Sequence, residues 1–122
     1  MTRKPDPFTA WMHEQPVKTR LLFVCSSNLD RSPAAAELFA GSKKYEAKSC
    51  GILPHSETVI SKEAIKWADK IYCMESVHRD FIVQNFKEAR GKDIEILNIP
   101  SNLCRNDPKL IEILKEKLAE KV

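Results

Sequence analysis

The sequence predicts an α/β protein in which a small doubly wound sheet of four parallel strands lies between two layers of helices. Two observations predict this three-layer αβα fold. Short, continuous apolar runs alternate along the chain with segments whose apolar residues recur at helical spacing. The length of 122 residues also suits one domain with a single core of modest size. Strands that alternate with helices pair in parallel through right-handed crossovers, which places helices on both faces of the sheet.

The expected elements follow one another closely from residue 19 onwards. Residues 19–25 form a short apolar run, which is typical of a strand buried on both faces. Ser32-Pro33 predicts a helix start, with the serine as cap and the proline in the first turn, and Gly41 is expected to end that helix. Further strands are expected at 45–50, 70–74 and 93–99, and further helices at 61–69, 76–89 and 107–118.

The chain divides into an N-terminal arm, residues 1–17, and an α/β domain, residues 18–122. Three prolines interrupt any regular pattern in the arm, so we expect it to cover a surface groove or, alternatively, to bind a partner. Residues 1–18 contain no apolar segment of the kind found in secretory signals, and no apolar run is long enough to cross a membrane. These features predict a cytoplasmic protein.

Charge and cysteine usage narrow the classes of ligand. The net charge of +3 favours anions slightly but does not indicate binding to nucleic acid or to a membrane. The cysteines form no Cys-x-x-Cys pair, so we expect free thiols rather than a disulfide framework or a zinc site. We therefore expect no metal and no other cofactor. We also expect a monomer or a weak dimer.

Residues 25–33 join the end of a strand, a tight loop and the start of a helix, with Cys25 first and Arg31 after the loop. Inward-facing N–H groups and the positive end of the helix can hold an anion there, and the guanidinium of Arg31 matches two phosphate oxygens. The same groups favour the thiolate form of Cys25. We predict that Cys25 attacks a phosphate held by Arg31 and the loop. The loop residues are Ser26, Ser27, Asn28, Leu29, Asp30 and Ser32.

Individual loop residues carry further expectations. Asn28 is the residue best able to adopt an unusual backbone angle. Ser32 either gives its hydroxyl hydrogen to the Cys25 sulfur or only caps the helix. The alternative for Cys25 itself is a buried cysteine at a strand end, packed like a small apolar residue. Strand, loop, Ser-Pro and helix in succession favour the nucleophile.

Asp107 is the candidate general acid. Ligands of doubly wound sheets bind at the carboxyl ends of the strands, and the loop after the fourth strand brings Asp107 to the same edge as Cys25 and Arg31. An aspartate there can protonate the leaving group. Asp107 also precedes Pro108 at a helix start, which by itself explains an aspartate as a helix cap. The two roles are compatible.

These residues resemble the low-molecular-weight protein tyrosine phosphatases, and most closely a compact bacterial and archaeal branch. The resemblance spans about residues 19–118. It implies that Cys25 forms a cysteinyl-phosphate while Arg31 and the loop amides stabilise the charge. It also implies that Asp107 protonates the departing oxygen and then activates water, without a metal. The matching segments are Val24 to Pro33 with Ala36-Glu37, Ser49-Cys50-Gly51, Trp67 to Met74, and Asp107-Pro108.

The chain departs from that family in three places. Asp30 stands where typical members have a second cysteine, so no protective disulfide can form there, and we expect its carboxylate to point outward. Lys109 and Leu110 replace the aromatic residues that wall the cleft for phosphotyrosine. The region between residues 51 and 61 is short. We therefore expect a shallow cleft for a phosphorylated protein or a small phosphomonoester.

Other functions remain open. A thiol-based arsenate reductase has a similar fold, and Cys73 and Cys104 would then be its resolving cysteines. A non-catalytic module that binds phosphate or phosphopeptides would keep the loop without turnover. RNA polymerase tail phosphatases have a similar loop but are much longer. His13, His55 and His78 share no ligand spacing, so the sequence assigns them no role.

Overall fold

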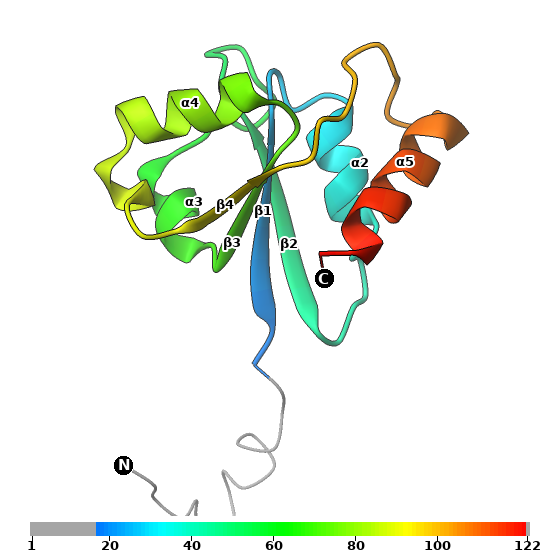
Figure 1. Ribbon diagram of the computed structural model, residues 1–122, viewed down its shortest axis with the longest axis horizontal. Coiled ribbons are helices and arrows are strands. Elements are labelled where there is room, and N and C mark those ends of the chain that lie inside the picture. Colours follow the sequence, from blue (N-terminus) through cyan, green and yellow to red (C-terminus); the bar gives the residue numbers. More distant parts are fainter. Residues whose placement is uncertain (1–16, 122) are drawn as a thin grey trace, which may run out of the picture.

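The computed structural model describes residues 17–121, and the expected arm at 1–17 lies almost entirely outside these residues. Four parallel strands form one sheet in the order β2-β1-β3-β4 (Figure 1). The predicted α/β fold is confirmed. The strands are β1 (Thr19–Cys25), β2 (Tyr45–Gly51), β3 (Lys70–Cys73) and β4 (Asp93–Ile96).

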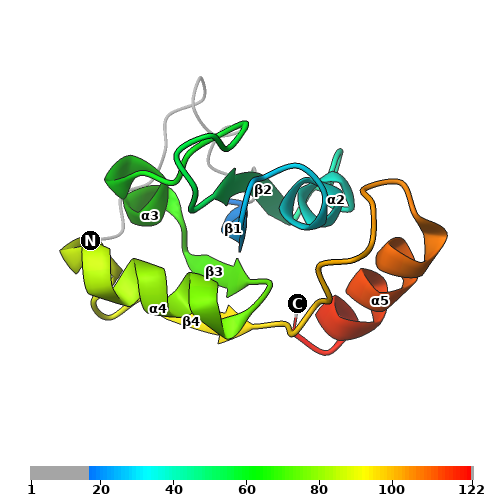
Figure 2. The ribbon, with the colours of Figure 1, turned by 90° about the horizontal axis from the view of Figure 1, so that it is seen from above.

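Helices cover both faces of the sheet, as Figure 2 shows from above. One face packs against α2 (Arg31–Glu37) and α5 (Pro108–Ala119). The other packs against α3 (Lys62–Trp67), α4 (Ser76–Asn85) and the short 3-10 helix η1 (Lys87–Ala89). Each side of the sheet therefore has its own apolar core, and the three-layer arrangement follows from strands that are apolar on both faces.

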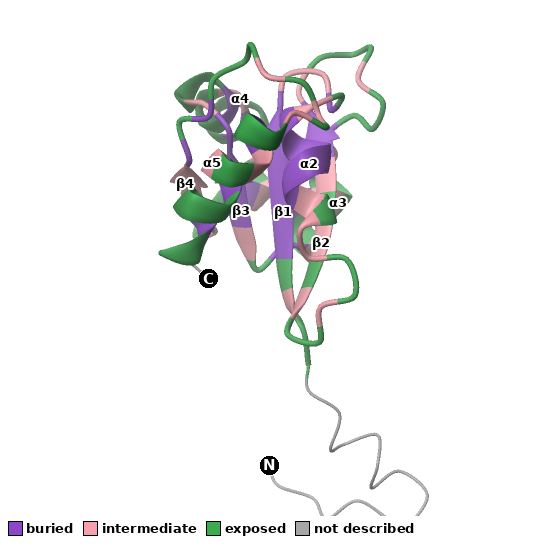
Figure 3. Ribbon diagram, turned by 90° about the vertical axis from the view of Figure 1, so that its right-hand side faces the viewer, coloured by how far each residue is buried: buried purple, intermediate pink, exposed green. Residues whose placement is uncertain are grey.

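Strand β1 is the central element of the fold (Figure 3). Its residues from Leu21 to Cys25 are all buried, and successive side chains enter opposite cores because side chains alternate along a strand. Leu22 and Val24 belong to the core beneath α3 and α4, whereas Phe23 and Cys25 belong to the core beneath α2 and α5. Burial on both faces explains the continuous apolar run and delivers Cys25 to the carboxyl edge of the sheet.

Several element boundaries differ from the predicted ones. The expected helix at 76–89 stops at Asn85 and continues as the separate η1. The expected fourth strand at 93–99 ends at Ile96, although the N–H of Ile99 still bonds the Met74 carbonyl at 2.8 Å. The predicted cap at Ser61 is confirmed, because its hydroxyl accepts the N–H of Ala64 at 3.1 Å. No helix within residues 17–121 has the length and apolar character needed to cross a lipid bilayer.

Candidate active site

A pocket of about 210 Å³ opens at the carboxyl end of β1. We call it the anion pocket, and we call residues 25–31 the phosphate loop. All but one of the lining residues come from this loop, so a single contiguous segment builds most of the pocket. A larger hollow of about 520 Å³ lies beside α4 and η1 but contains none of the predicted site residues. The residues that line the anion pocket are Cys25, Ser26, Ser27, Leu29, Asp30, Arg31 and Ser101.

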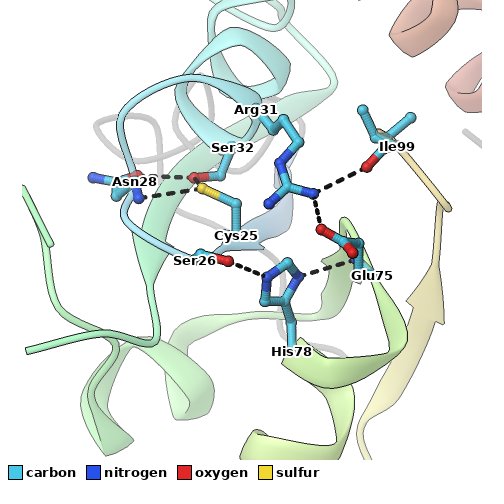
Figure 4. Close-up of polar contacts among 8 residues, drawn as sticks. All are labelled: Cys25, Ser26, Asn28, Arg31, Ser32, Glu75, His78 and Ile99. Atoms are coloured by element: carbon cyan, nitrogen blue, oxygen red, sulfur yellow. Dashed lines mark hydrogen bonds and ion pairs between the residues drawn. The ribbon is translucent and has the colours of Figure 1, made fainter. Parts of the chain in front are cut away.

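The sulfur of Cys25 lies at the base of this pocket, surrounded by polar groups (Figure 4). The backbone N–H of Asn28 donates to Sγ at 3.2 Å, and the Ser32 hydroxyl lies 2.9 Å from Sγ. Asn28 has a φ of 56°, the left-handed conformation expected from the sequence, and this turns its N–H back toward the sulfur. Contacts of this kind stabilise a thiolate.

Ser32 does not cap α2, so that part of the prediction is wrong. The helix begins one residue earlier, with Asp30 at the cap position and no side-chain cap bond. The Ser32 hydroxyl is completely buried and points inward, where it contacts the Cys25 sulfur, the Asn28 Oδ1 at 2.9 Å and the Cys50 carbonyl at 3.2 Å. The contact with the Cys25 sulfur is the alternative role that the sequence analysis expected for Ser32.

The backbone of the phosphate loop is oriented by the segment that follows β2. Three N–H groups of that segment bind three consecutive loop carbonyls. Because the C=O and N–H of a trans peptide point in opposite directions, outward carbonyls leave the next N–H groups facing inward. The inward N–H groups belong to Ser26, Ser27 and Asn28. The bonds run from Ile52, Leu53 and Glu57 to Cys25, Ser26 and Ser27, at 3.1, 3.0 and 3.2 Å.

Gly51 permits this close approach. A Cβ at residue 51 would lie 2.7 Å from the Ser26 carbonyl oxygen and 2.8 Å from the Asn28 nitrogen. Both are backbone atoms of the phosphate loop, so they cannot move aside without deforming it. The loop geometry therefore requires glycine at this position.

Arg31 is buried, and its guanidinium is held by two groups from other elements (Figure 4). Nη1 donates to the carbonyl of Ile99 at 3.0 Å and forms an ion pair with the carboxylate of Glu75. Within residues 17–121 both contacts use Nη1, which leaves Nε and Nη2 for the oxygens of an anion. Sequence reasoning missed Glu75, although it follows the third strand at the same sheet edge as Cys25.

His78, on α4, links Glu75 to the phosphate loop and was also missed. Its Nδ1 accepts the N–H of Glu75 at 3.0 Å, so the neutral ring carries its proton on Nε2 and donates it to the Ser26 hydroxyl at 3.0 Å. Burial, with the nearby Arg31 charge, lowers the pKa of His78 to about 4. One histidine within a helix has no spacing pattern, so the sequence holds no signal for it.

Both candidate aspartates are engaged by backbone groups. Asp30 lines the anion pocket, but its Oδ1 accepts the N–H of Arg105 at 3.0 Å. Asp107 caps α5, with Oδ1 accepting the N–H of Lys109 at 2.9 Å. Asp107 is not among the residues that line the anion pocket, unlike Ser101 of the same loop. The structure thus brings Cys25, Arg31 and the other loop residues together, and it places Asp107 at the cap position that the sequence also predicts.

Comparisons with known proteins agree with this geometry. No family model matches the chain. A protein-arginine-phosphatase of Geobacillus stearothermophilus is 28% identical over 141 residues, which cover 84% of this chain and 95% of that protein. The structure of the YwlE arginine phosphatase from Geobacillus stearothermophilus is 27% identical, with a TM-score of 0.61. The match covers 84% of this chain and 92% of the YwlE chain.

A low-molecular-weight protein tyrosine phosphatase structure from T. tengcongensis is 25% identical, with a TM-score of 0.60, and covers 86% of this chain and all (100%) of its own. The chain is therefore similar to phosphatases of the low-molecular-weight protein tyrosine phosphatase type over most of its length. The resemblance expected from residues 24–33 is thereby confirmed. The two Geobacillus stearothermophilus relatives are named arginine phosphatases, so the similarity extends to proteins that remove phosphate from other proteins.

The other cysteines of this protein differ from Cys25 in their surroundings. Cys50 and Cys73 lie in the opposite core, beneath α3 and α4. Burial raises the pKa of each to about 12, so neither supplies a thiolate at neutral pH. Cys104 is exposed in the loop before α5, and all four cysteines are free thiols. Within residues 17–121, no group of metal-ligating side chains lies together.

Proposed function

We propose that the protein hydrolyses phosphate esters on other proteins through a cysteinyl-phosphate formed on Cys25. The observation that carries this proposal is the Cys25 sulfur at the base of the anion pocket, with the Asn28 N–H at 3.2 Å. A phosphate in the pocket meets the inward N–H groups and the free edge of the Arg31 guanidinium. These groups stabilise the charge that develops on the oxygens of the transition state.

The reaction proceeds in two steps. The Cys25 thiolate attacks phosphorus, so that an S–P bond forms while the bond to the leaving oxygen breaks, and Asp107 gives its proton to that oxygen. Asp107, now ionised, then takes a proton from water. That water attacks phosphorus, the S–P bond breaks, and inorganic phosphate leaves with the thiolate restored.

The position of Asp107 supports this acid role. Arg105, two residues earlier, bonds the phosphate loop through its N–H. Two Cα steps span at most about 7–8 Å, so Asp107 lies within a short reach of that contact. The cap bond to Lys109 uses only Oδ1, which leaves Oδ2 to carry the proton. We call residues 101–107 the acid loop.

For the substrate we propose phosphotyrosine on proteins. Leu29 lies at the pocket rim with 53% of its surface exposed, and it offers an apolar contact for an aromatic ring. Phosphoarginine is the second candidate, favoured by the 28% identical relative that is named a protein-arginine-phosphatase. The proposal includes a cytoplasmic location, because a nucleophilic thiol needs a reducing compartment.

The first experiment measures turnover of a chromogenic aryl phosphate and its inhibition by vanadate. We expect turnover that Cys25→Ser abolishes, while Cys104→Ser, which alters an exposed cysteine outside the anion pocket, retains it. Binding of phosphate without turnover would instead support the non-catalytic module. Comparing kcat/KM for phosphotyrosine and phosphoarginine peptides then decides between the two substrates.

A second experiment addresses Asp107 and the arsenate reductase alternative. Asp107→Ala should slow hydrolysis of esters with poor leaving groups by about 10²–10⁴-fold, and an unchanged rate would exclude the acid role. A thioredoxin-coupled assay with arsenate tests the alternative. Arsenate turnover that Cys104→Ser removes, with aryl phosphate hydrolysis retained, would favour reduction.

A further inference from the structure

The acid loop is tied to the phosphate loop by contacts that bring residues far apart in sequence together. Just before the acid loop, the Ile99 carbonyl accepts Nη1 of Arg31 at 3.0 Å. Further along, the N–H of Arg105 donates to Oδ1 of Asp30 at 3.0 Å. The Asp30 contact joins residues 75 positions apart and reaches the acid loop two residues before Asp107.

We propose that Asp30 is a positioning residue that anchors the acid loop so that Asp107 can deliver its proton to the leaving group. This inference rests on the proposed phosphatase mechanism. Asp30 precedes Arg31 directly, so its carboxylate moves with the groups that hold the phosphate. A bond from this carboxylate to the backbone of residue 105 therefore sets the distance between the bound phosphate and the acid.

The bond has the properties that an anchor needs. An ionised carboxylate accepting a backbone N–H forms a charge-assisted bond, about twice as strong as a neutral one. Its donor is main chain, so it restrains the path of the acid loop itself rather than a flexible side chain. The Arg105 side chain adds an ion pair with Glu37 on α2, but both partners are exposed, and such pairs contribute little.

The same carboxylate has an opposing effect on the phosphate. A negative charge that lines the anion pocket repels a bound anion. Removing Asp30 therefore has two consequences of opposite sign. It releases the acid loop, which slows proton delivery, and it removes a repulsive charge, which favours attack. In the attack step, the slower proton delivery matters only for leaving groups that need a proton, whereas the lost repulsion matters for all substrates.

The test is a series of aryl phosphates with leaving groups from good (p-nitrophenol) to poor (phenol). We expect Asp30→Ala to lower kcat/KM for phenyl phosphate by about 10–100-fold while the value for p-nitrophenyl phosphate changes less than about 3-fold. The ratio kcat/KM is compared because it reports attack by Cys25 and departure of the leaving group, and not the later hydrolysis in which Asp107 acts on every substrate. Asp30→Asn, which keeps an Oδ1 acceptor without the charge, should recover most of the loss. Glu37→Gln, which removes only the exposed ion pair, serves as the matched control and should stay close to the wild type.

The pH profile provides a second readout. Loss of the acid flattens the fall of kcat/KM for phenyl phosphate at alkaline pH, so Asp30→Ala should show a flatter alkaline limb than Asp30→Asn. A role limited to stabilising the fold would leave the shape of this limb unchanged. If Asp30→Ala does not fold, Asp30→Ser, whose hydroxyl is too short to span the same distance, replaces it in both measurements.

Equal losses on all substrates, or no loss on phenyl phosphate, would overturn the role of Asp30. Asp107→Ala, measured on the same series, separates this failure from failure of the mechanism. If Asp107→Ala shows the leaving-group dependence and Asp30→Ala does not, only the anchor is wrong. If Asp107→Ala shows none, the acid assignment fails and the anchor fails with it.

Discussion

The phosphate loop and the acid loop meet at one pocket but are held in different ways. In the phosphate loop, Asn28 and Arg31 are almost fully buried, and the carbonyls of residues 25–27, the Arg31 guanidinium and the Cys25 sulfur all have partners. In the acid loop, by contrast, every residue from 101 to 107 is exposed or half-buried. Under the proposed mechanism, the buried phosphate loop holds the charge of the phosphate in a fixed geometry, whereas the proton comes from the acid loop, a segment held by few bonds. Exposed segments with few hydrogen bonds, such as the acid loop, open more readily than buried ones.

The first prediction tests how rigid the phosphate loop must be. Gly51→Ala places a Cβ against two backbone atoms of that loop, so we expect a loss of about 3 kcal/mol in the free energy of unfolding, and loss of turnover. Gly41→Ala is the matched control, because its φ of 78° is strained for alanine but its surroundings are empty. It should cost about 1 kcal/mol and leave activity intact. Urea unfolding measures the stability of the two variants, and turnover of an aryl phosphate measures their activity. An active Gly51→Ala protein would contradict the packing argument.

The second prediction concerns acid and the buried His78. Its pKa is about 4 in the folded protein against an ordinary value of 6.5, so between these values the unfolded chain binds a proton that the folded chain does not. Folding stability therefore falls as the pH drops below about 6.5 and keeps falling to about pH 4. Between pH 7 and pH 5 the loss is about 2 kcal/mol.

Urea unfolding at several pH values, compared with His78→Gln, isolates this effect. The variant should be less stable at pH 7 but should lack the part of the pH dependence that the histidine causes. Identical pH dependence in the two proteins would show that His78 does not remain neutral in the fold.

The third prediction separates the two loops by kinetics. Glu75→Gln removes the charge that pairs with Arg31, so we expect kcat/KM to fall about 10-fold to the same degree for good and poor leaving groups, since the arginine acts on the phosphate itself. Asp80→Asn, an equal charge change at an exposed position of α4, the helix that Glu75 precedes, should have no effect. A loss confined to poor leaving groups would place Glu75 with the acid loop instead.

The smallest expected effect concerns the stability contribution of Asp107. Replacing an N-cap aspartate by alanine removes the bond to the Lys109 N–H and should cost about 1 kcal/mol, whereas asparagine keeps a capping oxygen and should cost little. Under the proposed mechanism, both variants lose the acid. Thermal unfolding therefore measures the capping role of Asp107, and turnover of phenyl phosphate measures its acid role. Equal stabilities of Asp107→Ala and Asp107→Asn would contradict the capping bond.

The features that sequence analysis predicted correctly are local. The alternation of apolar runs and helical segments predicts the three-layer fold, because burial on both faces leaves its pattern in each strand. The unusual backbone of Asn28 is likewise a property of one residue type in a tight loop. The Ser61 cap also needs only a few neighbouring residues. Boundaries such as the end of α4 at Asn85 were less accurate, because they depend on packing.

By itself, then, the sequence determined the fold class, the Cys25 nucleophile candidate and the resemblance to a phosphatase family, since contiguous residues carry all three. Tertiary structure alone decided what each polar group contacts. Ser32 turns inward because Cys25, Asn28 and Cys50 surround it. Glu75 and His78 reach the phosphate loop only because β3 lies beside β1, and Asp30 meets Arg105 across 75 positions. Hydrogen bonds need partners within about 3 Å, and for distant residues only the folded chain sets that distance.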